Sequence, residues 1–261
     1  MNAIVGSHDL LWLVFDTLRF DVAQEAWAAG ETPFLASLLG PEGWEARQTP
    51  GNFTYAAHQA FFAGFLPTPP GPGPHPRLFA ARFAGSTSTG AGTCVLDAPD
   101  LPRGLAERGY RTICIGGVGF FNLETPLGKA LPGLFQEAHW SPALGVTDPD
   151  STRHQVELAC RLLGESPPQE RVFLFINLSA LHQPNCHYLP GAEADSRESH
   201  AAALAYVDSQ LEPLVAAFRK RGESFALLCA DHGTCYGEEG LWGHRVNHPA
   251  VLTVPYAEVL L

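Results

Sequence analysis

Acidic and histidine side chains follow three short apolar runs of the chain. Asp16 comes directly after the run that ends at residue 15, and His182 follows the run that ends at residue 178. Asp231 and His232 come directly after the run that ends at residue 230. Sites in open α/β sheets form beyond the carboxyl ends of the strands, so we expect these side chains to meet. Carboxylate and imidazole groups are ligands of zinc and manganese, and the pattern predicts a divalent-metal site.

Each of these residues also has a structural interpretation when it is considered alone. An aspartate after a strand, such as Asp16, commonly caps a helix or forms a turn. Adjacent titratable residues at the end of a buried strand, such as Asp231 and His232, are costly to bury unless they are paired or bound to metal. The joint pattern, rather than any one residue, favours the metal site.

A hydroxyl group that could act as a nucleophile lies between the first two of these segments. Thr54 is predicted to lie where a loop turns into a helix, where free N–H groups and the helix dipole favour negative charge. Its structural alternative is a helix N-cap. Aliphatic hydroxyls are weak nucleophiles until a base or a metal activates them. Thr54 and the Asp/His set together predict metal-assisted nucleophilic chemistry.

The elements that must position these groups are five short runs rich in β-branched and aromatic residues. The runs do not alternate with polar residues, which is typical of parallel strands covered by helices on both faces. We therefore expect a three-layer α/β/α sandwich with a largely parallel central sheet. The predicted strands are 10–15, 112–116, 172–178, 225–230 and 251–254, and the predicted helices are 33–39, 61–65, 101–109, 154–163 and 199–221.

The composition is that of a globular protein. Hydrophobic residues make up 46% and charged residues 16% of the 261 residues, which is too little charge for a disordered chain or a coiled coil. We expect a single domain over 1–261. The stretch 66–75, in which proline and glycine dominate, is interpreted as a surface loop rather than a linker.

Charge and cysteine usage exclude some classes of partner. The formal net charge is −11, so no nucleic-acid partner is expected. The first 30 residues lack a secretory-signal pattern and the run 10–15 is too short to span a bilayer, so no membrane partner is expected. The six cysteines form no CxxC pair and are interpreted as reduced thiols. These features predict a cytoplasmic location.

Five ordered motifs resemble those of the alkaline phosphatase and sulfatase superfamily. The segments Asp16-Thr-Leu-Arg-Phe-Asp and Thr32-Pro-Phe-Leu-Ala-Ser-Leu look like the opening metal-aspartate block and the TPNLDRLA helix of sulfatase-like enzymes. Thr54 stands at the nucleophile position, and Gly64 and Pro67 follow it at the spacing of the CxPSR…TGxxP signature. The segment from Gly109 is similar to the GYxTxxIGKWH block, and the segment from Asp231 to His244 is similar to SDHGExxGEHGLWGK. The resemblance implies an alkaline phosphatase-like fold, and the nearest likeness is to short bacterial sulfatase-like metal-dependent hydrolases.

Departures from the sulfatase pattern favour phosphate over sulfate chemistry. Thr54 replaces the Cys or Ser that sulfatases convert to formylglycine. Gly117 and Gly119 stand where sulfatases place a Lys and a His, and His58 stands where they place an Arg. His244 replaces their second Lys and resembles the phosphatase and phosphoethanolamine-transferase branches, in which a histidine there serves a second metal. Because the chain ends soon after His244, we expect the C-terminal subdomain of most sulfatases to be absent.

The resemblance also implies a ligand set for one or two divalent ions, zinc or manganese. The first ion would be held by Asp16, Asp231 and His232, with Thr54 bridging to substrate. A second ion would use His182 and His244, with His187 or His248 as a further ligand. A substrate-contacting role fits His182 equally well. His58 would donate a hydrogen bond to the transferred group or protonate the leaving oxygen.

These features predict a metal-dependent hydrolase or transferase that acts on a small anionic ester. The substrate would be a phosphate monoester, a diester or a phosphonate, and attack by Thr54 on phosphorus would give a phosphothreonine intermediate. Two alternatives stay open. One is a sulfate-ester hydrolase that uses the same site, and the other is a non-catalytic metal-binding accessory protein that has kept the scaffold.

Overall fold

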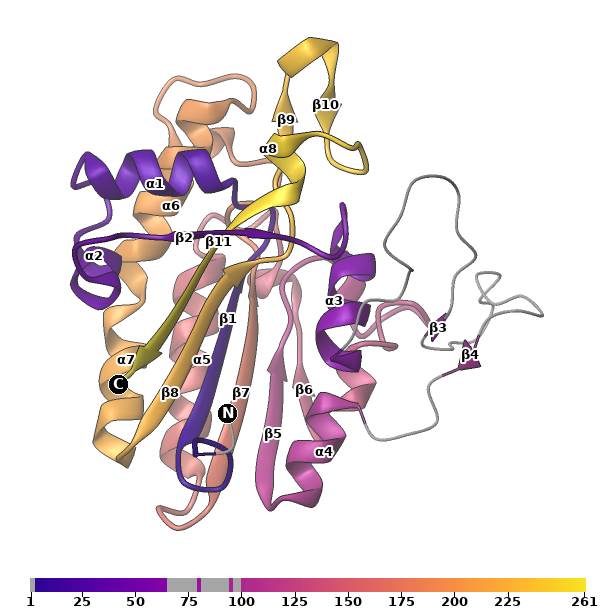
Figure 1. Cartoon of the computed structure of the whole chain (residues 1–261), viewed down its shortest axis with the longest axis vertical. Helices are drawn as coiled ribbons and strands as arrows, with labels where there is room; N and C mark the ends of the chain where they lie inside the picture. Colours follow the sequence, from indigo (N-terminus) through magenta and orange to yellow (C-terminus); the bar gives the residue numbers. More distant parts are fainter. Residues whose placement is uncertain (1–2, 65–78, 81–93, 96–99) are drawn as a thin grey trace.

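A seven-stranded sheet forms the middle layer of the molecule (Figure 1). The computed structural model describes residues 3–64, 79–80, 94–95 and 100–261. The strands of the sheet are β1 Asp9–Phe15, β2 Glu45–Gln48, β5 Tyr110–Ile115, β6 Glu137–His139, β7 Arg171–Leu178, β8 Ser224–Ala230 and β11 Thr253–Leu260. Their order is β2-β11-β8-β1-β7-β5-β6. Strands β8, β1, β7, β5 and β6 are parallel, and β11 runs antiparallel to both of its neighbours. The predicted largely parallel sheet is confirmed.

Helices cover both faces of this sheet and complete the predicted three layers. They are α1 Phe20–Ala28, α2 Pro33–Leu39, α3 Thr54–Ala63, α4 Leu101–Glu107, α5 Ser151–Glu165, α6 Arg197–Gln210, α7 Glu212–Arg221 and α8 Pro249–Leu252. Leu11 and Leu13 of β1 belong to a core cluster with residues of α1, α2, α5, α6 and α7. Leu10 and Trp12 belong to a second cluster with residues of α3 and α4. Burial of β1 on both faces explains its unbroken apolar run.

Several predicted elements differ from the structure, and two of them differ for identifiable reasons. The single helix predicted over 199–221 is two helices, α6 and α7. Pro213, which cannot donate an intrahelical hydrogen bond, lies in the first turn of α7 and separates them. The run 251–254, predicted as a parallel strand, is the end of α8 followed by the start of the antiparallel strand β11. His248 caps α8 by accepting a hydrogen bond of 3.1 Å from the N–H of Ala250.

Short elements complete the fold. The pairs β3 Phe79–Ala80 with β4 Cys94–Val95, and β9 Cys235–Tyr236 with β10 Trp242–Gly243, form two small ribbons. Strands β2 and β6 were not predicted, and every residue of β2 is exposed, so it carries no hydrophobic pattern. The predicted surface loop 66–75 and Pro67 lie outside the described residues.

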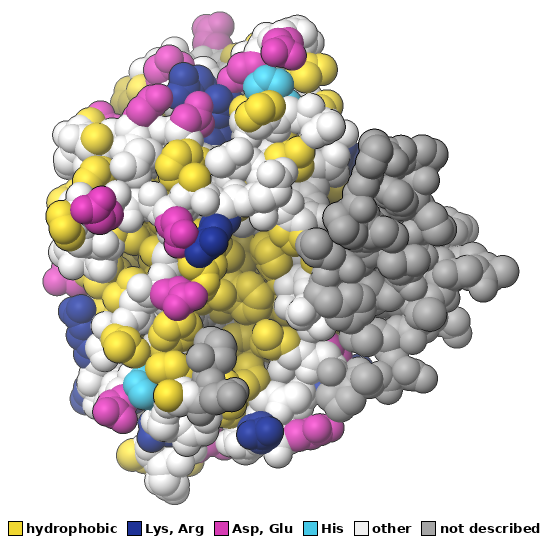
Figure 2. Space-filling model, viewed as in Figure 1, with side chains coloured by type: hydrophobic (Ala, Val, Ile, Leu, Met, Phe, Trp, Pro, Cys, Tyr) yellow, Lys and Arg dark blue, Asp and Glu magenta, His cyan; other side chains and the backbone are white. Residues whose placement is uncertain are grey.

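A hollow with mainly apolar walls opens on the sheet face that carries α4 (Figure 2). Its volume is about 660 Å³, and it is lined by Val5, Leu10, Leu11, Trp12, Leu101, Gly104, Leu105, Arg108, Phe173, Phe225 and Leu227. Leu10 lies near the amino end of β1, whereas Asp16 follows its carboxyl end. The hollow is therefore distinct from the polar cluster at the carboxyl edge of the sheet.

Candidate active site

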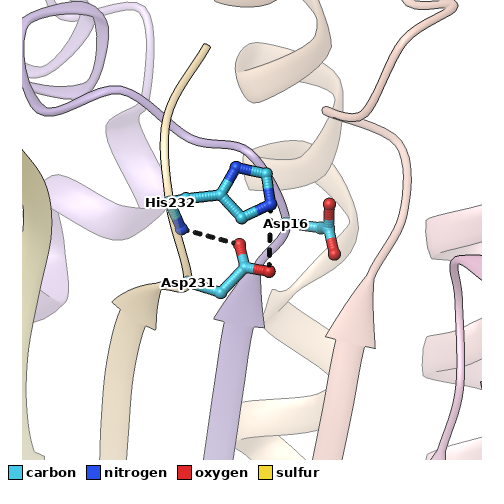
Figure 3. Close-up of side chains that lie close together, drawn as sticks. All are labelled: Asp16, Asp231 and His232. Carbon is cyan, nitrogen blue, oxygen red and sulfur yellow. Dashed lines mark hydrogen bonds and ion pairs between the residues drawn. The ribbon is translucent and has the colours of Figure 1, made fainter. Parts of the chain in front are cut away.

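The two aspartates predicted to bind metal come from neighbouring parallel strands. Phe15 of β1 pairs with Ala230 of β8, so Asp16 and Asp231 leave the sheet side by side. Both carboxyl groups are fully buried, as is the His232 ring. One potential ligand atom from each of these three residues lies within 4.8 Å of the others (Figure 3). The structure thus brings together the first predicted ligand set.

Hydrogen bonds leave one oxygen of Asp231 available. Its Oδ1 accepts from the backbone N–H groups of Thr17, at 3.0 Å, and His232, at 2.9 Å. Thr17 has a φ of 72°, a left-handed conformation that is uncommon outside glycine. Among the described residues, Oδ2 has no hydrogen-bond partner, and it lies 3.4 Å from Nε2 of His232 (Figure 3). A buried carboxylate oxygen without a donor is what a bound cation would satisfy.

The two carboxyl groups have opposite pKa shifts. Burial, followed by the negative charge of Asp16, raises the pKa of Asp231 well above its usual value. Burial alone would also raise the pKa of Asp16, but His182, His232 and hydrogen bonds from Asn177 and Thr17 outweigh it and lower that pKa. Two buried carboxylates this close cannot both ionise without a compensating charge. The donor set of two carboxylates and an imidazole therefore fits a divalent cation.

Thr54 points its hydroxyl at this cluster. Its Oγ1 lies 3.4 Å from Oδ2 of Asp16 and 3.3 Å from Nε2 of His232, and the side chain is buried. Thr54 is the first residue of α3, and the N-cap position belongs to Phe53. The hydroxyl is therefore not an N-cap, which was its structural alternative. It lies at a helix N-terminus, where negative charge is stabilised.

His58 lies one turn along α3 from Thr54. Its Nδ1 is 2.7 Å from the carbonyl oxygen of Thr54 and 3.7 Å from Oδ2 of Asp231. Its ring packs against Phe61, Phe62, Phe121 and Phe175, all with ring centroids within 6 Å. Burial lowers its pKa to about 4, so the ring is neutral at pH 7. This geometry makes His58 a support for Thr54, and its role as a proton donor stays a prediction.

The structure brings two of the predicted second-site histidines to the same cluster. The ring centroid of His244 lies 4.7 Å from that of His232 and 5.6 Å from that of His182. Burial, then the neighbouring His232 and His182, lowers the pKa of His244 to about 4. Nδ1 of His244 has no hydrogen-bond partner among the residues that the structure describes. His182 and His244 are therefore arranged as a possible second pair of ligands.

The other two candidate histidines have different neighbours. His187 packs its ring on Tyr188 at a centroid distance of 4.2 Å, and Asp195 is the charge that acts on it. The Nδ1 atom of His248 is engaged as the cap of α8. Neither residue is joined to the Asp16 cluster by these contacts, so their ligand roles stay predictions.

Sequence reasoning missed Asn177. The Nδ2 atom of this buried residue of β7 donates to Oδ2 of Asp16 at 2.8 Å, and its Oδ1 accepts from the N–H of Val118 at 3.0 Å. The available signal was a polar side chain inside the run 172–178, which is otherwise apolar. The structure also explains why residue 117 is a glycine, since a Cβ there would lie 2.3 Å from the carbonyl oxygen of Asn177. A lysine at this position, as in sulfatases, would not fit.

Comparisons with known proteins identify the fold. No family model matches the sequence, and no curated protein matches it. The C-terminal periplasmic domain of phosphoethanolamine transferase EptC from Campylobacter jejuni is similar, with a TM-score of 0.63 and 12% identity over 96% of this chain and 79% of that one. An alkaline phosphatase superfamily protein from Vibrio parahaemolyticus has a TM-score of 0.57 and 14% identity over 96% of this chain and 60% of that one. The chain has the alkaline phosphatase-like fold.

A third structure with the alkaline phosphatase-like fold contains metal. The C-terminal periplasmic domain of EcEptC from Escherichia coli, in complex with Zn, has a TM-score of 0.63 and 11% identity over 98% of this chain and 74% of that one. In this chain, Asp16, Asp231 and His232 form a cluster of potential ligand atoms.

The comparisons contradict the predicted cytoplasmic location. The structures with the same fold include C-terminal periplasmic domains. The prediction depended on the lack of a signal pattern and on scattered cysteines, neither of which determines where a folded domain resides. None of the helices in the described part of the chain combines the length and the apolar character needed to cross a bilayer.

Proposed function

We propose that this protein is a metal-dependent enzyme that hydrolyses or transfers the phosphoryl group of phosphate esters, with Thr54 as the nucleophile. The observation that carries the proposal is the position of Oγ1 of Thr54, within 3.4 Å of both Asp16 and His232 in a buried ligand cluster. The fold and the zinc complex of the similar EcEptC domain support it.

Asp16, Asp231 and His232 would hold one divalent ion, and His182 and His244 would contribute to a second. A bound divalent ion favours the ionised hydroxyl of a nucleophile and polarises the oxygens of a phosphoryl group. Oγ1 of Thr54 would form a bond to phosphorus while the bond to the leaving oxygen breaks, which gives phosphothreonine. Water, or the hydroxyl of an acceptor, would then take the phosphoryl group and free Thr54.

The chain's own contacts hold the nucleophile in place for this step. The N–H of the His58 ring donates to the carbonyl oxygen of Thr54 and fixes the first turn of α3. Asn177 and Thr17 fix the two oxygens of Asp16 by hydrogen bonds of 2.8 Å each. A site held on strand ends and a helix start is rigid, as nucleophilic attack requires.

The test is trapping of the covalent intermediate. The protein, loaded with Zn²⁺ or Mn²⁺, is mixed with aryl phosphate monoesters, diesters and phosphonates and with the aryl sulfate of the same leaving group. We expect turnover of at least one phosphorus ester, and acid-quenched protein should carry one phosphoryl group on Thr54 by mass spectrometry. T54A should lower kcat by about 10³-fold or more while it keeps its metal.

A matched control is T125A, which removes a hydroxyl from an exposed turn at Thr125 and should keep full activity. Full activity of T54A would refute the nucleophile. Cleavage of the sulfate alone would favour the sulfate-ester alternative, and metal binding without turnover of any ester would favour the accessory-protein alternative.

A further inference from the structure

An exposed arginine lies beside the nucleophile and is not part of the site described above. Arg245 follows His244, and its backbone N–H donates to the carbonyl oxygen of Asn52 at 2.8 Å. Its guanidinium carbon lies 5.0 Å from the centroid of the Phe53 ring. Phe53 directly precedes Thr54, so these two contacts fix Arg245 against the segment that presents the nucleophile.

The charge of Arg245 is not compensated by a carboxylate in the described part of the chain. Arg19, Arg111 and Arg221, by contrast, each contact an aspartate or glutamate at 2.8 Å or less. Arg245 directly follows His244, whose ring centroid lies 4.7 Å from that of His232, so its backbone lies next to the cluster.

The backbone of Arg245 adds a second observation. Its φ is 70°, in the left-handed region that costs a non-glycine residue free energy. Such outliers persist where the surrounding structure fixes them, and they concentrate at functional sites. Here the left-handed turn accompanies the bond to Asn52 that holds the side chain at the Phe53 ring.

A guanidinium that stacks on an aromatic ring keeps its in-plane N–H donors free for a bidentate contact with an oxyanion. Phe53 is itself supported by Phe120, at a centroid distance of 6.2 Å. Since the chain carries a net charge of −11, a local cation is needed to attract an anionic substrate.

We propose that Arg245, supported by Phe53, forms an anion subsite that binds oxygens of the phosphate-ester substrate beside Thr54. The inference rests on the proposed function and names the residue that recognises the substrate. The oxyanion would belong either to the phosphoryl group that is transferred or to a second anionic group on the same substrate.

A second arginine–aromatic pair supplies the control. Arg47 lies over the ring of Tyr256 at 5.1 Å, and it is paired with Glu45 at 2.8 Å on the edge strand β2. Stacking alone therefore does not create a free anion site. R47A removes the same type of contact away from Thr54.

The first measurement is the Kd of inorganic phosphate for metal-loaded wild type, R245A, R245K and R47A, with metal content determined in parallel. Loss of a charge-assisted contact should raise the Kd of R245A by about 10- to 100-fold. R245K should be intermediate, because lysine keeps the charge but loses the planar donors. R47A should match wild type, and all four proteins should bind the same amount of metal.

The second measurement is kcat/KM for two aryl phosphates that differ by one carboxylate on the leaving group. A weaker phosphate Kd in R245A assigns the subsite to the transferred group. A fall in kcat/KM of R245A that is confined to the carboxylated substrate assigns the subsite to a second anionic group. Wild-type phosphate affinity and wild-type kinetics on both substrates in R245A would overturn the subsite alone. If wild type itself neither binds phosphate nor cleaves either ester, the proposed function fails, and the subsite with it.

Discussion

Asn177 donates a hydrogen bond of 2.8 Å from Nδ2 to Oδ2 of Asp16, across the neighbouring strands β7 and β1. Thr17 donates to the other oxygen of the same carboxylate, so the orientation of Asp16 is fixed from both sides. Asp231 is held through one oxygen only. The two aspartates therefore differ: one is oriented by side chains, and the other keeps an oxygen free for a cation.

Replacement of Asn177 is expected to weaken metal binding without unfolding the protein. Groups that orient metal ligands typically contribute about 10- to 100-fold to metal affinity, and N177A should lose an amount in this range. The measurement is competition with a chelating dye. N122A is the control, because the amide of Asn122 caps an exposed turn at Glu124 and Thr125. Equal affinity in N177A and wild type would show that Asp16 needs no such support.

The sequence was enough to predict that the candidate ligand residues lie together, but not which residues support them, and the reason is physical. Asp16, Asp231 and His232 follow apolar strands, and the rule that sites form at carboxyl ends of parallel strands was enough to bring them together. Asn177 lies inside a strand, where its role depends on which strand is the neighbour. Strand order is set by long-range packing and not by a local pattern, so this contact required the structure.

The same limit applies to the elements themselves. Four of the five parallel strands predicted from apolar runs are present, as β1, β5, β7 and β8, because burial on both faces gives a local signal. Strand β2 has no buried residue and pairs only with the antiparallel β11, which itself follows a helix capped by His248. These elements are determined by the strands and helices they contact, and their local sequence does not predict them.

Removal of one buried carboxylate should have opposite effects on the two forms of the protein. D231N removes the cost of burying a second carboxyl group beside Asp16 with one oxygen that lacks a hydrogen-bond donor, so the metal-free form should gain about 1–3 kcal/mol of unfolding free energy. Wild type should gain about 2.7 kcal/mol from metal at a free concentration of one hundred times its Kd. D231N should gain little unfolding free energy from the same concentration of metal. Thermal unfolding with metal and with chelator measures both effects, and equal metal stabilisation of the two proteins would contradict the ligand role of Asp231.

Gly117 is expected to tolerate no side chain, because its backbone lies against that of Asn177. A Cβ at this position would lie 2.3 Å from the carbonyl oxygen of Asn177, whereas a Cβ at Gly119 would meet nothing within 4 Å. G117A should therefore destabilise the fold by about 1–3 kcal/mol and also lower metal affinity, whereas G119A should do neither. Urea unfolding of both variants provides the test. A stable G117A with normal metal affinity would contradict the close packing and would reopen the sulfatase-like interpretation.

His200 gives the fold a predictable response to acid. It is fully buried on α6, and its Nδ1 lies 3.1 Å from the hydroxyl of Tyr236. Burial, followed by the charge of Arg19, lowers its pKa to about 3 from an ordinary value of 6.5. The folded protein therefore keeps this ring neutral over a pH range in which the unfolded chain protonates it.

The sign of the effect follows from proton uptake. Above pH 6.5 both states carry a neutral His200, and the residue makes no pH-dependent contribution. Between pH 6.5 and about 3 the unfolded chain binds a proton that the folded chain excludes, so the unfolding free energy falls as the pH falls. The slope from this one residue is about 1.4 kcal/mol per pH unit, and the loss is complete below pH 3.

H200Q removes this titration, so the fall of its unfolding free energy with decreasing pH should be less steep than that of wild type by this slope. The measurement is urea unfolding of wild type and H200Q from pH 7 to pH 4 in the presence of chelator, so that metal release does not contribute. H200Q is expected to be less stable than wild type at pH 7, because it loses the fitted ring, and to lose less stability at pH 4. If the difference in unfolding free energy between the two proteins stays constant across this range, His200 takes up its proton as readily in the folded state as in the unfolded chain. The interpretation of His200 as a neutral buried ring would then be wrong.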